Sequence, residues 1–275
     1  MFLNNQYCYV DMNKTGTVYV NNILKKINND YYCKHHEIPS DKVIESNIIK
    51  FGTIRDPFSW YVSLWSYGCL KNQKSGMYNN LTRFKIFSSY GTPDNKIKAL
   101  FKKNIAYINL NLKFNTQALY NDLSNPILFR KWLKIVLSEE FAPIVDYPMY
   151  NSNLYKHCGP FTARMIKFYF KNHRINNGKI NLHKGLRSFL EDNCYLDDFI
   201  ELNNLGRNLV SFFKKYNFHI GEAKQKFHKQ NTASIKIEHY DRETYNLVLD
   251  KEHIMINYMK DKWNINLNTK YEYFK

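Results

Sequence analysis

Apolar and polar positions at the start of the chain follow two different periods. Residues 6–10 form a short apolar run that ends at Asp11, which is typical of a buried strand. Residues 18–27 place apolar side chains at 20, 23, 24 and 27, the spacing of one helix face. A polar segment, 11–17, separates the two patterns. The chain is therefore expected to open with a strand, a polar loop and a helix.

A second strand–helix unit follows. Short strands are predicted at 31–33 and 48–54, with a short helix at 40–46 between them. Asp56 suits the N-cap of a further helix, and Pro57 suits its first position. Alternation of strands and helices favours a parallel sheet covered by helices, which is an α/β fold.

The rest of the chain shows mainly helical spacing. Residues 70–195 are expected to be largely helical, and a strand pattern returns only at 196–202. The clearest helices are predicted at 126–137, 161–170, 205–216 and 242–259. No repeat or Pro/Gly-rich linker divides the chain. The prediction is a single domain over residues 1–275, with a central, mostly parallel sheet flanked by helices and a helical insert at about 70–195.

The composition of the chain indicates the chemical class of its binding partner. The 275 residues include 40 Lys plus Arg against 24 Asp plus Glu, a net charge of +16, and 44% hydrophobic residues exclude a disordered chain. The charge favours an anionic partner such as nucleic acid, a phosphorylated cofactor, an acidic glycan or a membrane surface. The abundance of Asn, Lys, Ile, Tyr and Phe, which have A/T-rich codons, offers a genomic origin for part of it.

Location and metal content are also predicted from composition. No apolar run approaches the roughly 18–20 residues of a membrane span, and no secretion signal is recognisable at the start. The five cysteines are widely spaced, which favours reduced thiols and a cytoplasmic protein. Cys33, His35 and His36 lack a second ligand pair at zinc spacing, so no metal is expected.

The first polar loop has the chemistry of a phosphate site. In Asn13-Lys14-Thr15-Gly16-Thr17, backbone N–H groups precede a helix, Gly16 allows close approach of an anion, Lys14 adds a charge and Thr17 a hydroxyl donor. The loop is not a Walker A motif, because Lys14 precedes its glycine. The alternative interpretation is an ordinary turn.

Arg55 and Ser63 form a second candidate anion site. Arg55 ends a predicted parallel strand, at the sheet edge where open α/β sheets bind ligands. Ser63 follows eight residues later on the next helix, about two turns away, so both side chains could hold one phosphate. The alternative is an arginine paired with a carboxylate and an unrelated surface serine.

The two motifs together resemble the sulfotransferases that use 3′-phosphoadenosine-5′-phosphosulfate (PAPS). In that family a Lys-Thr-Gly-Thr-type loop binds the 5′-phosphosulfate, and a segment Ile-Arg-Asp-Pro-x-x-x-x-Val-Ser binds the 3′-phosphate. The second segment corresponds here to residues 54–63. The resemblance implies a P-loop-NTPase-like architecture, and PAPS as the cofactor. The cofactor-binding residues it implies are Lys14, Thr15, Gly16, Thr17, Arg55 and Ser63, with Lys14 also stabilising the leaving group.

Weaker similarities and departures accompany these motifs. Residues 199–205 resemble the late strand and turn of the family, with Asn203 where a glutamate is usual. Asn231-Thr232-Ala233-Ser234 resembles the family's C-terminal Asn-x-Ser loop. Val18 stands where many relatives have a second hydroxyl residue, and residues 70–195 match poorly.

The acceptor hydroxyl needs a base. His36 is the first candidate, His35 the second and Glu37 the third, because all three follow a strand expected to end at the same sheet edge. The alternative is a simple polar turn. In relatives the base is commonly His or Glu.

The expected function is transfer of a sulfuryl group from PAPS to an acceptor hydroxyl, by analogy on a glycan. A nucleotide-dependent phosphotransferase with a degenerate loop, an inactive sulfotransferase-like binding protein and a basic nucleic-acid-binding protein are the alternatives. No nucleic-acid partner is expected, because the basic residues are dispersed and no nucleic-acid-binding signature is present.

Overall fold

A computed structural model describes residues 1–70, 75–84, 96–172, 182, 184–219 and 239–267. Its centre is a five-stranded sheet with strand order β3-β1-β2-β4-β5. The strands are β1 (Phe2–Leu3), β2 (Tyr7–Val10), β3 (Tyr32–Cys33), β4 (Ile49–Ile54) and β5 (Asp198–Glu201). β4 pairs in parallel with both β2 and β5, so the expected α/β class with a mostly parallel centre is confirmed.

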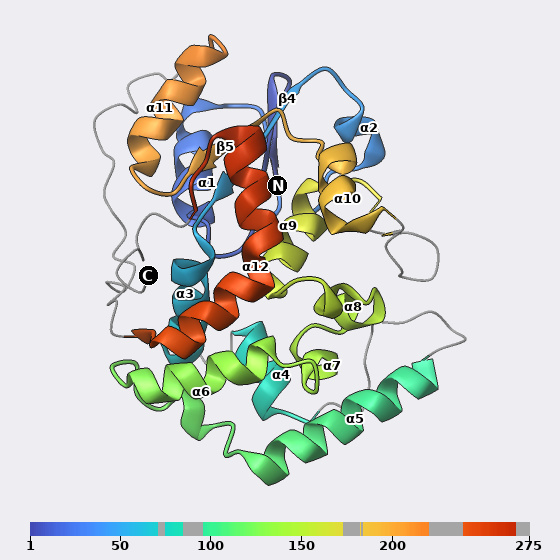
Figure 1. Cartoon of the computed structure of the whole chain (residues 1–275). Coiled ribbons are helices and arrows are strands. Elements are labelled where there is room, and N and C mark those ends of the chain that lie inside the picture. Colours follow the sequence, from blue (N-terminus) through green and yellow to red (C-terminus); the bar gives the residue numbers. More distant parts are fainter. Residues whose placement is uncertain (71–74, 85–95, 173–181, 183, 220–238, 268–275) are drawn as a thin grey trace.

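Helices flank this sheet (Figure 1). They are α1 (Thr17–Ile27), α2 (Asp41–Ile44), α3 (Pro57–Leu70), α4 (Gly76–Thr82), α5 (Lys96–Lys113), α6 (Pro126–Leu137), α7 (Ala142–Val145), α8 (Tyr147–Asn151), α9 (Pro160–Tyr169), α10 (Gly185–Asn193), α11 (Leu205–Lys215) and α12 (Arg242–Trp263). Within the described part of the chain, none of them is both long and apolar enough to cross a membrane.

The expectation that the chain begins with the strand at 6–10 is incomplete, because β1 precedes it. β1 pairs antiparallel with β2 and with β3, bringing Phe2 opposite both Tyr9 and Cys33. A two-residue strand carries no measurable period, so the pattern of the sequence could not indicate it. Two antiparallel pairings in succession leave β3 running in the same direction as β2. The residues after β3 therefore reach the sheet edge at which β2 and β4 end.

Alternating side chains of β2 divide the core between two faces of the sheet. Tyr7 and Tyr9 pack with residues of α1 and α11, whereas Cys8 and Val10 join a larger cluster built with α3, α9 and α12. Side chains of successive strand residues point to opposite faces, which explains why every residue of β2 is buried. The sheet is thus covered on both faces, and its carboxyl edge is left to the loops.

Candidate functional site

The carboxyl ends of β2, β4 and β5 bring three loops together. Arg55, directly after β4, donates from Nη1 to the carbonyl oxygen of Lys14 at 3.4 Å. A Cβ atom at Gly16 would lie 2.7 Å from Leu202 and 2.8 Å from Leu205, in the turn after β5. The Lys14 loop, Arg55 and the turn after β5 therefore meet at one edge of the sheet, as open α/β sheets arrange their ligand sites.

The backbone of the Lys14 loop turns sharply before helix α1 and leaves the N-terminus of that helix open to a ligand. Gly16 is the N-cap of α1 in a left-handed conformation, with φ of 85°, and Lys14 has φ of 68°. The N-cap makes no side-chain hydrogen bond, and the first turn of α1 contains no acidic residue. The first N–H groups of a helix have no intrahelical acceptor, and the helix dipole makes that end attractive to anions. This loop therefore suits a phosphate or sulfate group.

The threonine hydroxyls of the loop hold its shape. Thr15 and Thr17 both donate to the carbonyl oxygen of Met12, at 2.8 and 2.7 Å. Thr15 also accepts from Thr53 at 2.9 Å, and Thr53 contacts the Tyr9 hydroxyl at 2.9 Å. The Thr17 hydroxyl proton, expected to face an anion, is directed to Met12 instead. The N–H groups at the start of α1 are the better donors.

Lys14 carries a partly desolvated ammonium group. Its Nζ lies 3.3 Å from the centre of the Tyr67 ring, a cation–π contact with α3. Burial lowers the pKa of Lys14 to about 8, and the charge of Arg55 contributes in the same direction. Half-buried beside a second cation, Lys14 is placed to favour an incoming anion.

Arg55 is buried and is oriented by the first turn of α3. Its Nε donates to the Ser59 hydroxyl at 2.7 Å, and that hydroxyl in turn contacts the Asp56 carboxylate. Asp56 also accepts from the Ser59 N–H at 2.7 Å, as expected of an N-cap. Ser63 lies one turn further along α3 and is half-buried. Sequence reasoning missed Ser59, although its spacing from Asp56 is that of an N-cap partner.

Trp60, on the helix that follows Arg55, holds the Lys14 loop in place. Trp60 donates from Nε1 to the carbonyl oxygen of Asn13 at 3.0 Å, and its ring is buried. Tyr61 and Trp65 are buried as well, so these aromatic side chains of α3 belong to the core. The loop after β2 and the helix after β4 therefore form one connected structure.

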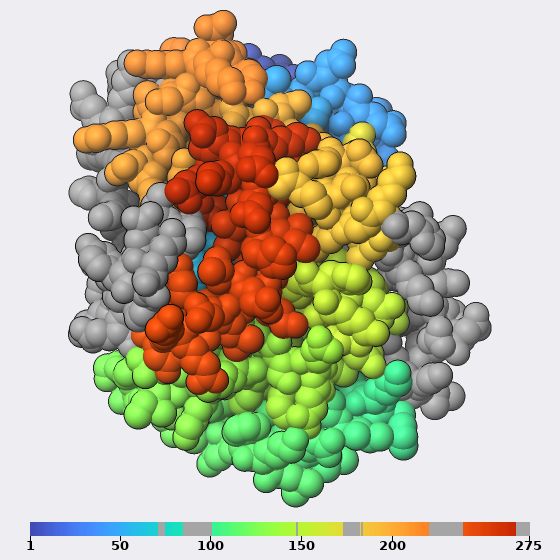
Figure 2. All heavy atoms as spheres, viewed as in Figure 1, coloured from blue at the N-terminus to red at the C-terminus, as the bar shows by residue number. Residues whose placement is uncertain are grey.

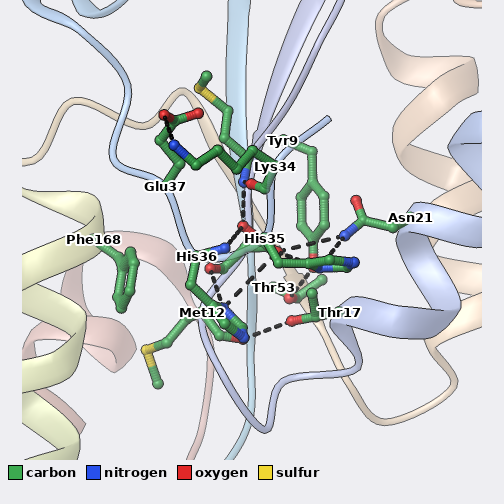
Figure 3. Close-up of polar contacts among 12 residues, drawn as sticks. Tyr9, Met12, Thr17, Asn21, Lys34, His35, His36, Glu37, Thr53 and Phe168 are labelled. Atoms are coloured by element: carbon green, nitrogen blue, oxygen red, sulfur yellow. Dashed lines mark hydrogen bonds and ion pairs between the residues drawn. The ribbon is translucent and has the colours of Figure 1, made fainter. Parts of the chain in front are cut away.

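A buried carboxylate organises the histidines at the end of β3 (Figure 3). Asp11 is fully buried and lies 3.2 Å from Nδ1 of His35 and 2.9 Å from the N–H of His36. It also accepts from the amino group of Met1. The Asn21 amide nitrogen lies 3.3 Å from His35 Nδ1 and 3.4 Å from Asp11 Oδ2. Because a carboxylate only accepts hydrogen bonds, the neutral His35 ring carries its hydrogen on Nδ1 and leaves Nε2 as an acceptor.

The three base candidates have different surroundings. His35 is 53% exposed, so its Nε2 is open to a substrate, and its Nδ1 faces the carboxylate. His36 directs Nδ1 to the backbone oxygen of Asp11 at 3.2 Å and packs edge-on against Phe168. Glu37 pairs with Lys34 at 3.2 Å. The carboxylate contact sets His35 apart from the other two.

Val18 is 51% exposed at the start of α1, and its side chain has no hydroxyl to offer a ligand there. The segment 231–234 lies outside the described residues. Among the residues that the structure describes, no three His, Cys, Asp or Glu side chains are grouped to hold a metal ion.

Comparisons with known proteins leave the chain without an assigned family. No protein-family model matches it, and neither the curated proteins nor the solved structures include a significant match.

Proposed function

We propose that the chain is a PAPS-dependent sulfotransferase with a P-loop-like site, and that its acceptor is a carbohydrate hydroxyl. The observation that carries the proposal is the hydrogen bond from Arg55 to the Lys14 carbonyl. It joins two motifs that are 41 residues apart and that resemble the two phosphate-binding segments of this family. Their meeting at the carboxyl ends of adjacent parallel strands supports one shared anionic ligand.

The residues present suit a ligand with two separate phosphate groups. The N-terminus of α1 with Lys14 would hold the 5′-phosphosulfate, while Arg55 and Ser63 would hold the 3′-phosphate. A side chain at Gly16 would press on the side chains of Leu202 and Leu205 and would be strained by the left-handed backbone there, so this cradle favours glycine. When bound, PAPS supplies the sulfuryl group and a phosphate oxygen that leaves with negative charge.

Lys14 and His35 would divide the chemical work. The Lys14 ammonium would neutralise the charge that develops on the leaving oxygen, a role for a preorganised cation. His35 would accept the proton of the acceptor hydroxyl at Nε2, and Asp11 would hold the ring in the required tautomer and stabilise its charged form. The ring of His36, the first candidate by sequence, is not within hydrogen-bonding distance of the Asp11 carboxylate, since its Nδ1 lies 3.9 Å from Asp11 Oδ2.

Cofactor binding is tested by thermal unfolding. Adenosine 3′,5′-bisphosphate, the desulfated product, should raise the Tm of the protein, and adenosine 5′-monophosphate should raise it less because it lacks the 3′-phosphate. Arg55→Ala should lose about tenfold or more in affinity for the bisphosphate, since it removes a charge-assisted contact.

Arg187→Ala is the control, because Arg187 lies on α10, where it pairs with Glu191 and Asp261. No Tm shift at millimolar bisphosphate, or equal effects of the two arginine variants, would contradict the cofactor assignment. Transfer of labelled sulfate from PAPS to a panel of glycans, phenols, lipids and peptides then tests the reaction. Transfer of phosphate from ATP in place of sulfate from PAPS would favour the phosphotransferase alternative.

A further inference from the structure

Helix α5 carries an exposed apolar stripe. Phe101, Ile105, Ile108 and Leu112 are 67%, 43%, 53% and 81% exposed. Their spacing of four, three and four residues places all four side chains on one face of the helix. Isolated exposed apolar residues are ordinary, but a contiguous row of large ones marks an interaction surface.

The opposite face of α5 is attached to the body of the molecule. Ala106 and Leu110 are buried, and α5 packs against α7. The helix forms the outer edge of the molecule, remote from the sheet (Figures 1 and 2). The apolar stripe therefore faces away from the core.

The charge on α5 has a single sign. Residues 96–113 include five lysines and no aspartate or glutamate. Lys102, which is exposed beside the stripe, contacts the neutral Tyr150 hydroxyl at 3.3 Å, so its charge is not neutralised there. Lys113 is paired with Glu140 at 2.7 Å, although both side chains remain about half exposed.

We propose that α5 is a membrane-surface helix that rests on an anionic bilayer. An apolar stripe bordered by lysine is the pattern of helices that lie in the plane of the lipid interface. The apolar side chains would enter the boundary of the acyl region, while Lys102 would reach the lipid phosphates. The net charge of +16 adds long-range attraction to an anionic surface.

Charge complementarity favours a bilayer over a second copy of the chain. If two α5 helices paired along the stripe, the flanking positions would be occupied by Lys102, Asn104, Asn109 and Asn111. These residues include no acidic partner for Lys102, so the pair would bring lysines together without compensation. An anionic lipid surface supplies the missing negative charge.

Vesicle co-sedimentation tests the proposal with the full chain. Binding is expected to vesicles of phosphatidylcholine mixed with phosphatidylserine, and to be much weaker with phosphatidylcholine alone. Leu112→Asn should weaken binding to the mixed vesicles about tenfold, because it removes an inserted leucine. Phe101→Ser should also weaken binding. Lys102→Glu should weaken binding too, and its effect should be larger at low salt than at high salt, because salt screens charge interactions.

Leu70→Asn is the matched control, since Leu70 is 62% exposed at the end of α3 and outside the stripe. Equal binding by the Leu112 and Leu70 variants would overturn the proposal, as would equal binding to neutral and anionic vesicles. A dimer in light scattering that Leu112→Asn dissociates, without vesicle binding, would assign the stripe to a second copy instead. All these side chains are exposed, so unchanged Tm values should accompany the variants.

Discussion

The surroundings of Lys14 lower the pKa of its ammonium group. The left-handed backbone at Lys14 and the ring of Tyr67 hold its ammonium close to Arg55, and partial burial removes some of its hydration. Burial and the charge of Arg55 disfavour the charged form of Lys14, yet an anion bound at the same place would favour it. The state of Lys14 is therefore coupled to ligand binding.

The pH dependence of sulfate transfer follows from this pKa. Lys14 titrates at about 8 instead of 10.5, so its ammonium is present below pH 8 and is lost as the pH rises. The value of kcat/KM should therefore fall above pH 8, by about tenfold per unit, because it reports the free enzyme. Lys14→Arg should retain its charge and shift this decline to higher pH.

Lys25→Arg is the matched control, because Lys25 is exposed on α1. Its pH profile should follow that of the unchanged protein. A profile that declines at the same pH in the Lys14→Arg protein would show that another group is responsible. An unbroken plateau up to pH 10 in the unchanged protein would contradict a role for the Lys14 charge.

At the scale of elements, the short strands β1 and β3 deliver a histidine to the site. β1 lies between β2 and β3 and pairs with both, so the chain after β3 returns to the end of β2. Asp11 joins the ends of β2 and β3, because it follows β2 directly and bonds to both His35 and His36 after β3. The pairing of two strands of two residues each is therefore enough to bring the histidines to Asp11.

Substitution of Asp11 tests the positioning of His35. Asp11→Asn allows an amide hydrogen to face Nδ1, which favours the tautomer with the hydrogen on Nε2 and removes the acceptor. Turnover should fall about 100-fold, within the range of general base catalysis. Affinity for adenosine 3′,5′-bisphosphate, measured by calorimetry, should change little, because the Asp11 carboxylate bonds to Met1, Asn21 and the histidine pair and to none of the proposed phosphate-binding residues.

Histidine variants separate this role from a structural one. His35→Gln should lower turnover as strongly as Asp11→Asn, and the double variant should lose little more, since the two residues act as a unit. His36→Gln should retain most of the activity. Loss of activity in His36→Gln with full activity in His35→Gln would return the base to His36.

The sequence predicted most long elements but not the details that join them. The strand at 48–54 and the helices at 126–137 and 205–216 have clear periods, and the structure agrees with them closely. β1 has no period, and the roles of Asp11 and Ser59 depend on residues that only the folded chain brings near. The loop at 13–17 was recognisable because its glycine and lysine are local features. That Arg55 and Ser63 hold one phosphate together stays a prediction.

At the scale of the whole molecule, Glu252 connects three helices. This carboxylate of α12 is fully buried, and it accepts hydrogen bonds from the Thr162 hydroxyl at 2.6 Å and the Thr162 N–H at 3.0 Å, at the start of α9. It also accepts from the Tyr61 hydroxyl of α3. A Cβ atom at Gly159 would overlap Glu252 Oε1, so the backbone approaches the carboxylate closely. Helix α3, which follows Arg55, is thus tied to α9 and α12 through hydrogen bonds to Glu252.

The stability of the fold should depend on the protonation of Glu252. Burial raises its pKa to about 7, although the hydrogen bonds from Thr162 and Tyr61 oppose the rise. The folded state therefore binds a proton more tightly than the unfolded chain, whose glutamates titrate at about 4.5. This contribution to stability is complete below pH 4.5 and is lost as the pH rises to 7, a difference of roughly 3 kcal/mol in the free energy of unfolding.

Chemical denaturation of the Glu252→Gln protein isolates this contribution, because glutamine does not titrate. The free energy of unfolding of the unchanged protein, relative to the variant, should decrease between pH 4.5 and 7 and stay level above pH 8. Glu243→Gln on the same helix, where the side chain is 71% exposed, should show no comparable trend. A difference that is constant with pH, or that increases toward pH 7, would mean that the hydrogen bonds from Thr162 and Tyr61 balance or outweigh burial. Glu252 would then link α3, α9 and α12 as a permanent anion.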